Sequence, residues 1–256
     1  MTQQLINLPP GYDLRSGYSV GGNGNCRHSY PPESMQVVDG DVQYECELCG
    51  MWRRYKPYVT NDVFGSGLFL LHEKSVCVIG SGPNGVGHAS RIPARAYRIA
   101  VNKAVMIPGI RADAWMAMDI TLPDNDWWEP CYERFGTGED RPVTIFGDLL
   151  AGSWPADFVF KSGRAMNHDN FIPEPNELRV GATVSAQAVM LAYHLGVKKI
   201  YLFGVDMSGA AYWDGTPAKA HLDGEWRCIN RFNGMMGWMR KQGVTIESLT
   251  TTELDA

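Results

Sequence analysis

SVCVIGSGPNGVG, residues 75–87, joins a short apolar run to a turn with four glycines. The run is rich in β-branched residues and contains no polar alternation, which is typical of a strand covered on both faces by helices. Glycines directly after such a strand allow a tight turn and a close approach to the backbone. The stretch therefore predicts a buried parallel strand followed by a loop at the edge of a sheet.

A second run of the same kind is KIYLFG, residues 199–204. It is preceded by apolar residues at helical spacing over 183–195, with Thr183 placed to cap the start of a helix and Gly196 placed to end it. Weaker strand patterns occupy residues 97–101, 114–118, 142–146, 157–160 and 244–249, and a second helix is expected over 225–242. Alternating strands and helices predict an α/β fold over residues 72–256, with a doubly wound, mainly parallel, Rossmann-like sheet.

The turn Gly80-Ser81-Gly82-Pro83-Asn84 is a candidate phosphate-binding loop. It follows the first strand, where the loops of a parallel sheet gather ligands, and its glycines bring backbone N–H groups close to a phosphate. Its spacing differs from the dinucleotide fingerprint, and it lacks the Gly-Lys-Ser/Thr ending of a P-loop. The alternative is a plain turn from strand to loop.

Residues 1–62 differ from the rest of the chain and predict a small zinc-ribbon-like module. Two pairs of ligand residues, Cys26 with His28 and Cys46 with Cys49, supply four ligands for a structural zinc ion. Apolar periodicity is weak in this part, so zinc would supply folding energy that burial cannot. A redox Cys-x-x-Cys is the alternative, but no thioredoxin-like unit accompanies it.

Bulk composition narrows the classes of function. The net charge of -5 gives no support for nonspecific binding to a polyanion. The beginning of the sequence lacks a signal-peptide pattern, and no stretch is long and apolar enough to span a bilayer. Six cysteines among 256 residues are too few for a secreted disulfide scaffold. We therefore expect a cytoplasmic protein.

Three motifs together resemble the bacterial lipooligosaccharide sialyltransferase family and the related 6-hydroxymethylpterin diphosphokinase-like family. They are the turn at residues 80–84, Val101-Asn102, and the helix-strand unit from Thr183 to Asp206, with His221 following. The resemblance covers roughly residues 75–250, and the unit ending at Asp206 is its most specific part. It implies a Rossmann-like transferase, with a homo-oligomer as its assembly.

In the sialyltransferases the turn and a following asparagine hold the cytidine nucleotide of the donor sugar. The resemblance thus assigns nucleotide binding to a set of residues, joined by the polar start of the helix. These are Gly80, Ser81, Gly82, Pro83, Asn84, Asn102, Thr183 and Ser185. It also assigns His221 as the general base on the acceptor hydroxyl and places Asp206 at the end of the strand beside the donor.

The chemistry of each residue supports its assigned role but also allows a purely structural role. A histidine side chain titrates near neutrality, so His221 can take a proton from a hydroxyl, although a loop histidine is often only solvated. Asp206 can accept from sugar hydroxyls or cap the loop that follows it. Tyr212 can stack on a base or donate to a leaving phosphate, or serve in packing. The amide of Asn102 offers donors and acceptors, or simply forms a turn.

The expected function is an inverting glycosyltransferase that uses a nucleotide-activated sugar, with a glycan or modified nucleic acid as acceptor. One alternative is an ATP- and magnesium-dependent pyrophosphokinase, in which Asp119 and Asp206 would hold the metal with the substrate phosphates. Another is a noncatalytic nucleotide-binding protein that retains the fold and the zinc module.

Overall fold

A computed structural model describes two parts of the chain. In the first part it describes only four strands, between residues 16 and 56; in the second it describes residues 75–137, 140–160, 183–208, 211–217 and 225–256.

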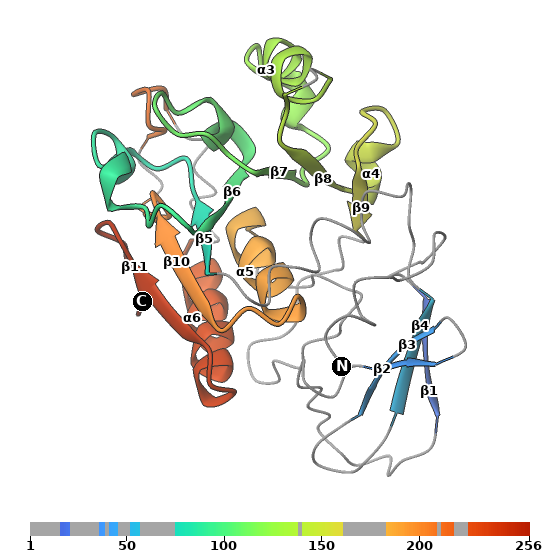
Figure 1. The fold of residues 1–256 in the computed structure, drawn as a ribbon. Coiled ribbons are helices and arrows are strands. Elements are labelled where there is room, and N and C mark those ends of the chain that lie inside the picture. The colour runs from blue at the N-terminus through green and yellow to red at the C-terminus, as the bar shows by residue number, and fades with distance from the viewer. Residues whose placement is uncertain are drawn as a thin grey trace.

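The second part is built on a seven-stranded sheet in which every neighbouring pair of strands is parallel. Figure 1 shows the strands side by side in the order β11-β10-β5-β6-β7-β8-β9. The strands are β5 (Val76–Ile79), β6 (Tyr97–Val101), β7 (Ala114–Ala117), β8 (Val143–Gly147), β9 (Phe158–Phe160), β10 (Lys199–Phe203) and β11 (Thr245–Ser248). The predicted parallel, Rossmann-like α/β sheet is confirmed, and each predicted strand lies within two residues of its observed bounds.

Both predicted helices are confirmed, as α5 (Val184–His194) and α6 (Glu225–Lys241). Two helices were not predicted, α3 (Trp128–Phe135) and α4 (Asp148–Ala151). The connections after β5 and β6 contain short 3-10 helices rather than α-helices, and the connection after β7 contains a 3-10 helix ahead of α3. These are η3 (Pro83–Gly85), η4 (Ala89–Arg91), η5 (Asn102–Met106) and η6 (Leu122–Asp124).

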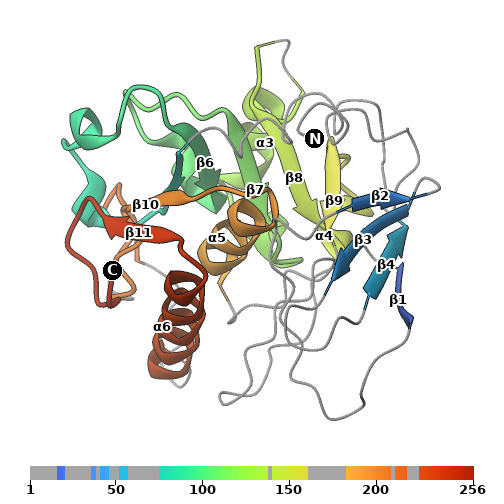
Figure 2. The same ribbon diagram turned by 60° about the horizontal axis from the view of Figure 1, so that its bottom comes forward.

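The strands separate two apolar layers, as alternation along a strand requires. In β5, Val76 and Val78 belong to the layer that contains α5 and α6, whereas Cys77 and Ile79 belong to the layer on the other face with α3. Figure 2 shows α5 and α6 together on one side of the sheet. Because both faces are covered, β5 is buried along its whole length, which explains its continuous apolar sequence.

The start of α5 is fixed by the predicted cap. The hydroxyl of Thr183 accepts a 3.2 Å hydrogen bond from the N–H of Ala186, and Gly196 adopts a φ of 79° just beyond the other end. A residue with a side chain rarely adopts that φ, so glycine suits the position. This cap holds Ser185 at the first turn of the helix, beside the ends of the strands.

Strand order places a switch point between β5 and β10. The chain runs outward from β5 through β6, β7 and β8 to β9, and then returns to lay β10 against the opposite side of β5. Connections leaving β5 and β10 therefore diverge at their carboxyl ends, which is where open α/β sheets form ligand crevices.

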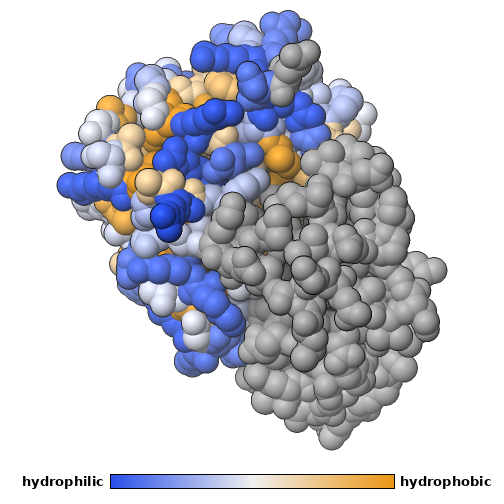
Figure 3. Space-filling model, viewed as in Figure 1, coloured by the Kyte–Doolittle hydropathy of each residue, from blue (hydrophilic) through white to orange (hydrophobic). Residues whose placement is uncertain are grey.

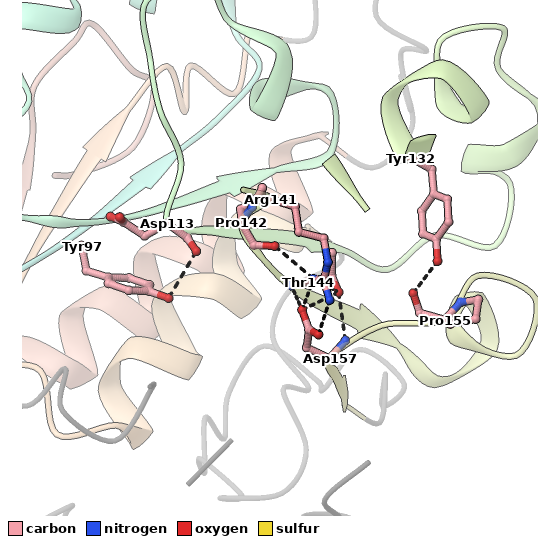
Figure 4. A network of polar contacts seen from close by, with 8 residues as sticks. All are labelled: Tyr97, Asp113, Tyr132, Arg141, Pro142, Thr144, Pro155 and Asp157. Carbon is pink, nitrogen blue, oxygen red and sulfur yellow. Dashed lines mark hydrogen bonds and ion pairs between the residues drawn. The ribbon is translucent and has the colours of Figure 1, made fainter. Parts of the chain in front are cut away.

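A polar network joins β8 and β9 at the amino-terminal edge of the sheet (Figure 4). The guanidinium of Arg141 contacts both carboxylate oxygens of Asp157, with 2.6 Å between Nη2 and Oδ1, and the N–H of Thr144 donates to Oδ2 at 2.8 Å. Burial of Asp157 opposes its ionisation, but the bonds from Arg141 and Thr144 outweigh burial and lower the pKa. The network lies at the edge opposite the switch point, so we assign it to stability.

The first part forms a separate antiparallel sheet in the order β1-β4-β3-β2. Its strands are β1 (Ser16–Val20), β2 (Gln36–Val38), β3 (Asp41–Glu45) and β4 (Trp52–Lys56). The predicted zinc ligands Cys26, His28, Cys46 and Cys49 lie outside the described residues. Elsewhere, the described ranges contain no cluster of three or more metal-ligating side chains.

The described surface is mainly hydrophilic in the view of Figure 3, with smaller apolar areas between. Large apolar side chains exposed in the described ranges are Val86, Ile120 and Leu149. Of the helices that are described, none has the length and apolar character needed to cross a membrane.

Candidate functional site

A cavity of about 140 Å³ lies at the switch point. It is lined by residues 80–82 after β5, residues 204–208 after β10, Ser185 in α5, and Ala211 with Tyr212 in the loop that follows. Three parts of the chain that are far apart in sequence, around residues 80–82, 185 and 204–212, thus converge where the topology predicts a ligand crevice.

The glycines of the turn are required by the close approach of two backbones. The N–H groups of Gly80 and Gly82 donate to the carbonyls of Phe203 and Gly204 at 2.7 and 2.8 Å. A Cβ added to Gly80 would lie 2.4 Å from the carbonyl oxygen of Gly204, and one added to Gly82 would lie 2.4 Å from the Asp206 carboxylate. Glycine is therefore needed here to pack the turn against the end of β10.

Asp206 is the central polar residue of the cavity. Its Oδ2 accepts a 2.8 Å hydrogen bond from the N–H of Asn84, and the residue is only 4% exposed. Its other oxygen, Oδ1, is buried and has no hydrogen-bond partner among the described residues. Burial raises the pKa of the carboxyl, partly offset by the bond from Asn84. A buried acceptor with no partner is costly, so Oδ1 is placed to receive a donor from a ligand.

The backbone N–H groups of the predicted binding residues differ in whether they already have partners within the protein. The N–H groups of Gly80, Gly82 and Asn84 are all donated within the protein, and Pro83 has none. Ser81 and Ser185 line the cavity, and their N–H groups make no hydrogen bond within the described ranges. Ser185 lies in the first turn of α5, whose N-terminus carries a partial positive charge. The glycine turn therefore shapes the wall of the cavity, and the N-terminus of α5 borders the cavity at Ser185.

Tyr212 is held at the cavity by a buried lysine that sequence reasoning missed. The ammonium of Lys103, just after β6, donates to Asp214 at 2.5 Å and to the hydroxyl of Thr216 at 2.9 Å. It also lies 5.4 Å from the centre of the Tyr212 ring. Burial acts to raise the pKa of Asp214, but hydrogen bonds from Lys103 and Thr216 outweigh it and lower the pKa to about 2.

Trp213 fastens the same loop to the glycine turn. Its N–H donates to the carbonyl of Ser81 at 2.8 Å, and its indole Nε1 donates to the carbonyl of Lys103 at 3.3 Å. Residues 211–217 are therefore tied to the segments that follow both β5 and β6. This attachment makes Tyr212 and Ala211 a fixed wall of the cavity.

The predicted site residues divide into three groups. Those that line the cavity are Gly80, Ser81, Gly82, Ser185, Asp206 and Tyr212. Those that do not line it are Pro83, which opens η3, Thr183, which caps α5, Asn84, which donates to Asp206, and Asn102, which begins η5. The third group is His221, which lies outside the described residues.

Asn102 and Asp119 end two neighbouring strands with different consequences. Asn102 has a φ of 48° and a buried Oδ1 without a partner among the described residues, features that suit a ligand contact. Oδ1 of Asp119 accepts from the N–H and hydroxyl of Thr121 at 2.9 and 3.1 Å. The suggested pairing of Asp119 with Asp206 at a metal gains no support, because this oxygen already caps a local turn.

Several lining residues were not predicted. Met207 has a φ of 59°, a conformation that non-glycine residues rarely adopt, and it follows Asp206 directly. Ser208 contributes an exposed hydroxyl, and the N–H of Gly204 donates to the hydroxyl of Thr250 at 2.9 Å. Backbone strain next to a buried carboxylate is typical of functional sites, but backbone dihedral angles cannot be predicted from the sequence at such a position.

The fold and the site define a Rossmann-like α/β domain with a cavity at its topological switch point. No protein-family model matches the chain, and no curated protein sequence matches it. Among solved structures, it is similar to the sialyltransferase CstII from Campylobacter jejuni in complex with the substrate analogue CMP-3FNeuAc. The identity is 13%, the alignment covers 72% of this chain and 86% of that chain, and the TM-score is 0.46.

A second similar structure is the monofunctional alpha-2,3-sialyltransferase Cst-I, also from Campylobacter jejuni. Its identity is likewise 13%, with 72% of this chain and 80% of that chain covered and a TM-score of 0.42.

Proposed function

We propose that this protein is a glycosyltransferase that uses a nucleotide-activated sugar as donor. The observation that carries the proposal is the buried Oδ1 of Asp206, which has no partner among the described residues and lies in the same cavity as Ser185 at the N-terminus of α5. The free carboxylate oxygen is stabilised by a hydrogen-bond donor, and the partial positive charge at the helix N-terminus favours an anion. A sugar phosphate or nucleotide offers both within one small molecule.

The residue pattern narrows the ligand class further. The turn at residues 80–84, Asn102, and the unit from Thr183 to Asp206 resemble the sialyltransferase motifs that hold a cytidine nucleotide. In the proposal, Ser81 and Ser185 contact the donor phosphate, and Asp206 accepts from hydroxyls of the ribose or the sugar. The cavity is smaller than the roughly 300–1,000 Å³ common for ligand pockets, so the described residues form the part that takes one portion of the donor.

The reaction in this proposal is a direct displacement. The acceptor oxygen forms a bond to the anomeric carbon as the bond from that carbon to the donor phosphate oxygen breaks, which inverts the configuration. His221 takes the proton of the acceptor hydroxyl. The released nucleotide carries the electron pair as phosphate, and Ser185 together with the hydroxyl of Tyr212 would stabilise this charge.

Nucleotide selectivity tests the donor class. A thermal-shift panel of CMP, UDP, GDP and ATP, each with and without magnesium, should show stabilisation by a nucleoside mono- or diphosphate without a metal requirement. Stabilisation by ATP with magnesium alone would contradict the proposal and favour a pyrophosphokinase. We propose a glycan as the acceptor, to be combined in transfer assays with the sugar conjugate of the nucleotide that stabilises the protein.

The general base is tested by His221→Ala, with His88→Ala as the matched control. His88 is exposed in the loop after the glycine turn, and its side chain makes no capping bond to the following 3-10 helix. His221→Ala should lower kcat by about 100-fold or more while leaving nucleotide binding intact, and His88→Ala should do neither. Equal activity of the two variants would remove His221 from the mechanism.

A further inference from the structure

A second and larger cavity lies at the opposite edge of the main sheet. It measures about 700 Å³ and is lined by Ser75, residues 94–98, Arg111 and Asp113. These residues come just before or at the start of β5, β6 and β7, at the amino-terminal ends of the strands. Ser75 and Gly80 flank the same strand, so the two edges are separated by about 16 Å at 3.3 Å per residue.

Three arginines give this cavity an excess of positive charge. The lining contains Arg95, Arg98 and Arg111 but only one carboxylate, that of Asp113. Three positive charges and one negative charge give the lining a formal charge of +2. Oδ2 of Asp113 accepts a 2.8 Å hydrogen bond from the N–H of Arg98. Such a concentration of one sign is unexpected on a chain with a net charge of -5.

None of the three guanidiniums forms an ion pair within the described part of the chain. The contact made by Nη1 of Arg98 is a 3.5 Å approach to the carbonyl oxygen of Arg111. Guanidinium groups present planar forks that match carboxylates and phosphates, and these three have no ion-pair partner of that kind among the residues that the structure describes.

The backbone under these arginines is rigid. The N–H of Asp113 donates to the carbonyl of Arg98 at 2.9 Å, and the N–H of Val143 donates to the carbonyl of Asp113 at 2.9 Å. The hydroxyl of Tyr97 also approaches that carbonyl at 3.5 Å, as Figure 4 shows. Arg98 lies in β6, and its backbone bond with Asp113 holds the segment that carries Arg111 beside that strand.

We propose that this cavity is a second binding site, for a ligand that carries at least two phosphate or carboxylate groups. Its volume falls within the range of small-molecule pockets. Because the cavity opens at the edge remote from the switch point, the site binds independently of the nucleotide. The proposal therefore stands or falls separately from the glycosyltransferase reaction.

Calorimetric titration with pyrophosphate and with citrate, at a fixed ionic strength of about 0.1 M, tests the site. We expect one of the two to bind, and Arg98→Gln and Arg111→Gln each to weaken it about tenfold or more. Arg134→Gln is the matched control: Arg134 is exposed on α3 and contacts the ring of Phe135, so its loss of charge should leave binding unchanged. A preference for pyrophosphate marks a phosphate-bearing ligand, and a preference for citrate marks a polycarboxylate.

Three results would overturn the second site. The first is absence of binding of either probe to the wild-type protein at millimolar concentration. The second is an equal loss of binding in Arg134→Gln, which would indicate a general charge effect. The third is a loss in Ser185→Ala with retention in Arg98→Gln, which would place the probe in the cavity at the switch point. Arg95→Gln, an exposed position, provides a further variant should Arg98→Gln fail to fold.

Discussion

The N–H of Asn84 donates a 2.8 Å hydrogen bond to Oδ2 of Asp206, across 122 residues of sequence. This bond joins the turn after β5 to the loop after β10 and turns the other carboxylate oxygen, Oδ1, into the buried acceptor of the cavity. The same carboxylate is therefore used for structure at one oxygen and is available for a ligand at the other.

Asp206→Asn should separate these two roles. Asparagine keeps an acceptor for the N–H of Asn84 but replaces the charge, so nucleotide affinity should fall about tenfold or more, measured by calorimetry, while the fold persists. Asp124→Asn, on an exposed carboxylate, is the control and should bind normally. Unchanged affinity in Asp206→Asn would remove this carboxylate from the site.

The same substitution should alter how stability depends on pH. Burial raises the pKa of Asp206 above its ordinary value of 3.8, so the folded state holds this proton more tightly than the unfolded state. Stability of the wild-type protein, relative to Asp206→Asn, should then increase as the pH falls from 7 through the raised pKa. Urea unfolding at several pH values measures this difference, and an opposite slope would contradict it.

Gly82→Ala should destabilise the fold and damage the site together. Its Cβ would lie 2.4 Å from the Asp206 carboxylate and 2.8 Å from the carbonyl oxygen of Gly204, so the loop after β10 must move. We expect a loss of about 1–3 kcal/mol in the free energy of unfolding, measured with urea. Gly234→Ala, inside α6 with open space around the added Cβ, should instead stabilise by about 0.5–1 kcal/mol.

Asp214→Asn should loosen the loop that carries Tyr212, because it removes the charged partner of buried Lys103. Hydrogen exchange of the Trp213 N–H, which donates to Ser81, should become faster. In the wild-type protein the lowered pKa means that this stabilisation is present above pH 3.8 and is lost as the pH falls through about 2. Glu247→Gln breaks the exposed ion pair with Lys199 and should leave this exchange unchanged.

Arg141→Met should destabilise the edge of the sheet at β8 and β9 without affecting nucleotide binding. It removes both contacts of the guanidinium with Asp157, and we expect a loss of about 1.5–3 kcal/mol, the range for hydrogen bonds to charged groups. Since the pKa of Asp157 is lowered, its contribution is present above the ordinary value of 3.8 and disappears as the pH falls below it. A variant as stable as wild type at pH 7 would contradict this assignment.

The zinc prediction is tested by metal analysis of the purified protein. One equivalent of zinc, reduced in Cys46→Ser and unchanged in Cys131→Ser, is the expected result, because Cys131 is a buried residue of α3 and lies outside the predicted ligand set. Less than about half an equivalent in the wild-type protein would rule out a structural zinc site.

Long apolar runs and capped helices are the features of this fold that a sequence reveals. The strand at residues 76–79 and the helix capped by Thr183 were predicted because each carries its own local signal. α3 was not, since it spans only Trp128–Phe135, contains Pro130, and owes its place to packing of Trp128 against Trp115 at a centroid distance of 5.3 Å. Such tertiary contacts override weak local propensity.

Sequence patterns predicted mainly those residues of the candidate site that directly follow a strand. Asp206 and the glycine turn follow the two strongest strands, so topology predicted that they meet. The pairing of Lys103 with Asp214 spans 111 residues and depends on how a loop folds back over β6, which no local pattern encodes. Likewise, the amides of Gly80 and Gly82 are used internally because β10 approaches the turn, and this tertiary contact has no local sequence signal.

The central claim is that a donor nucleotide binds at the switch point between β5 and β10. The most direct measurement is an amide NMR titration of isotope-labelled protein with CMP in the presence of a chelator. We predict that the signals of Ser81, Ser185 and residues 204–208 shift together and saturate, while those of Arg98 and Arg111 do not move. Saturable shifts confined to other segments, or none at millimolar CMP, would contradict it.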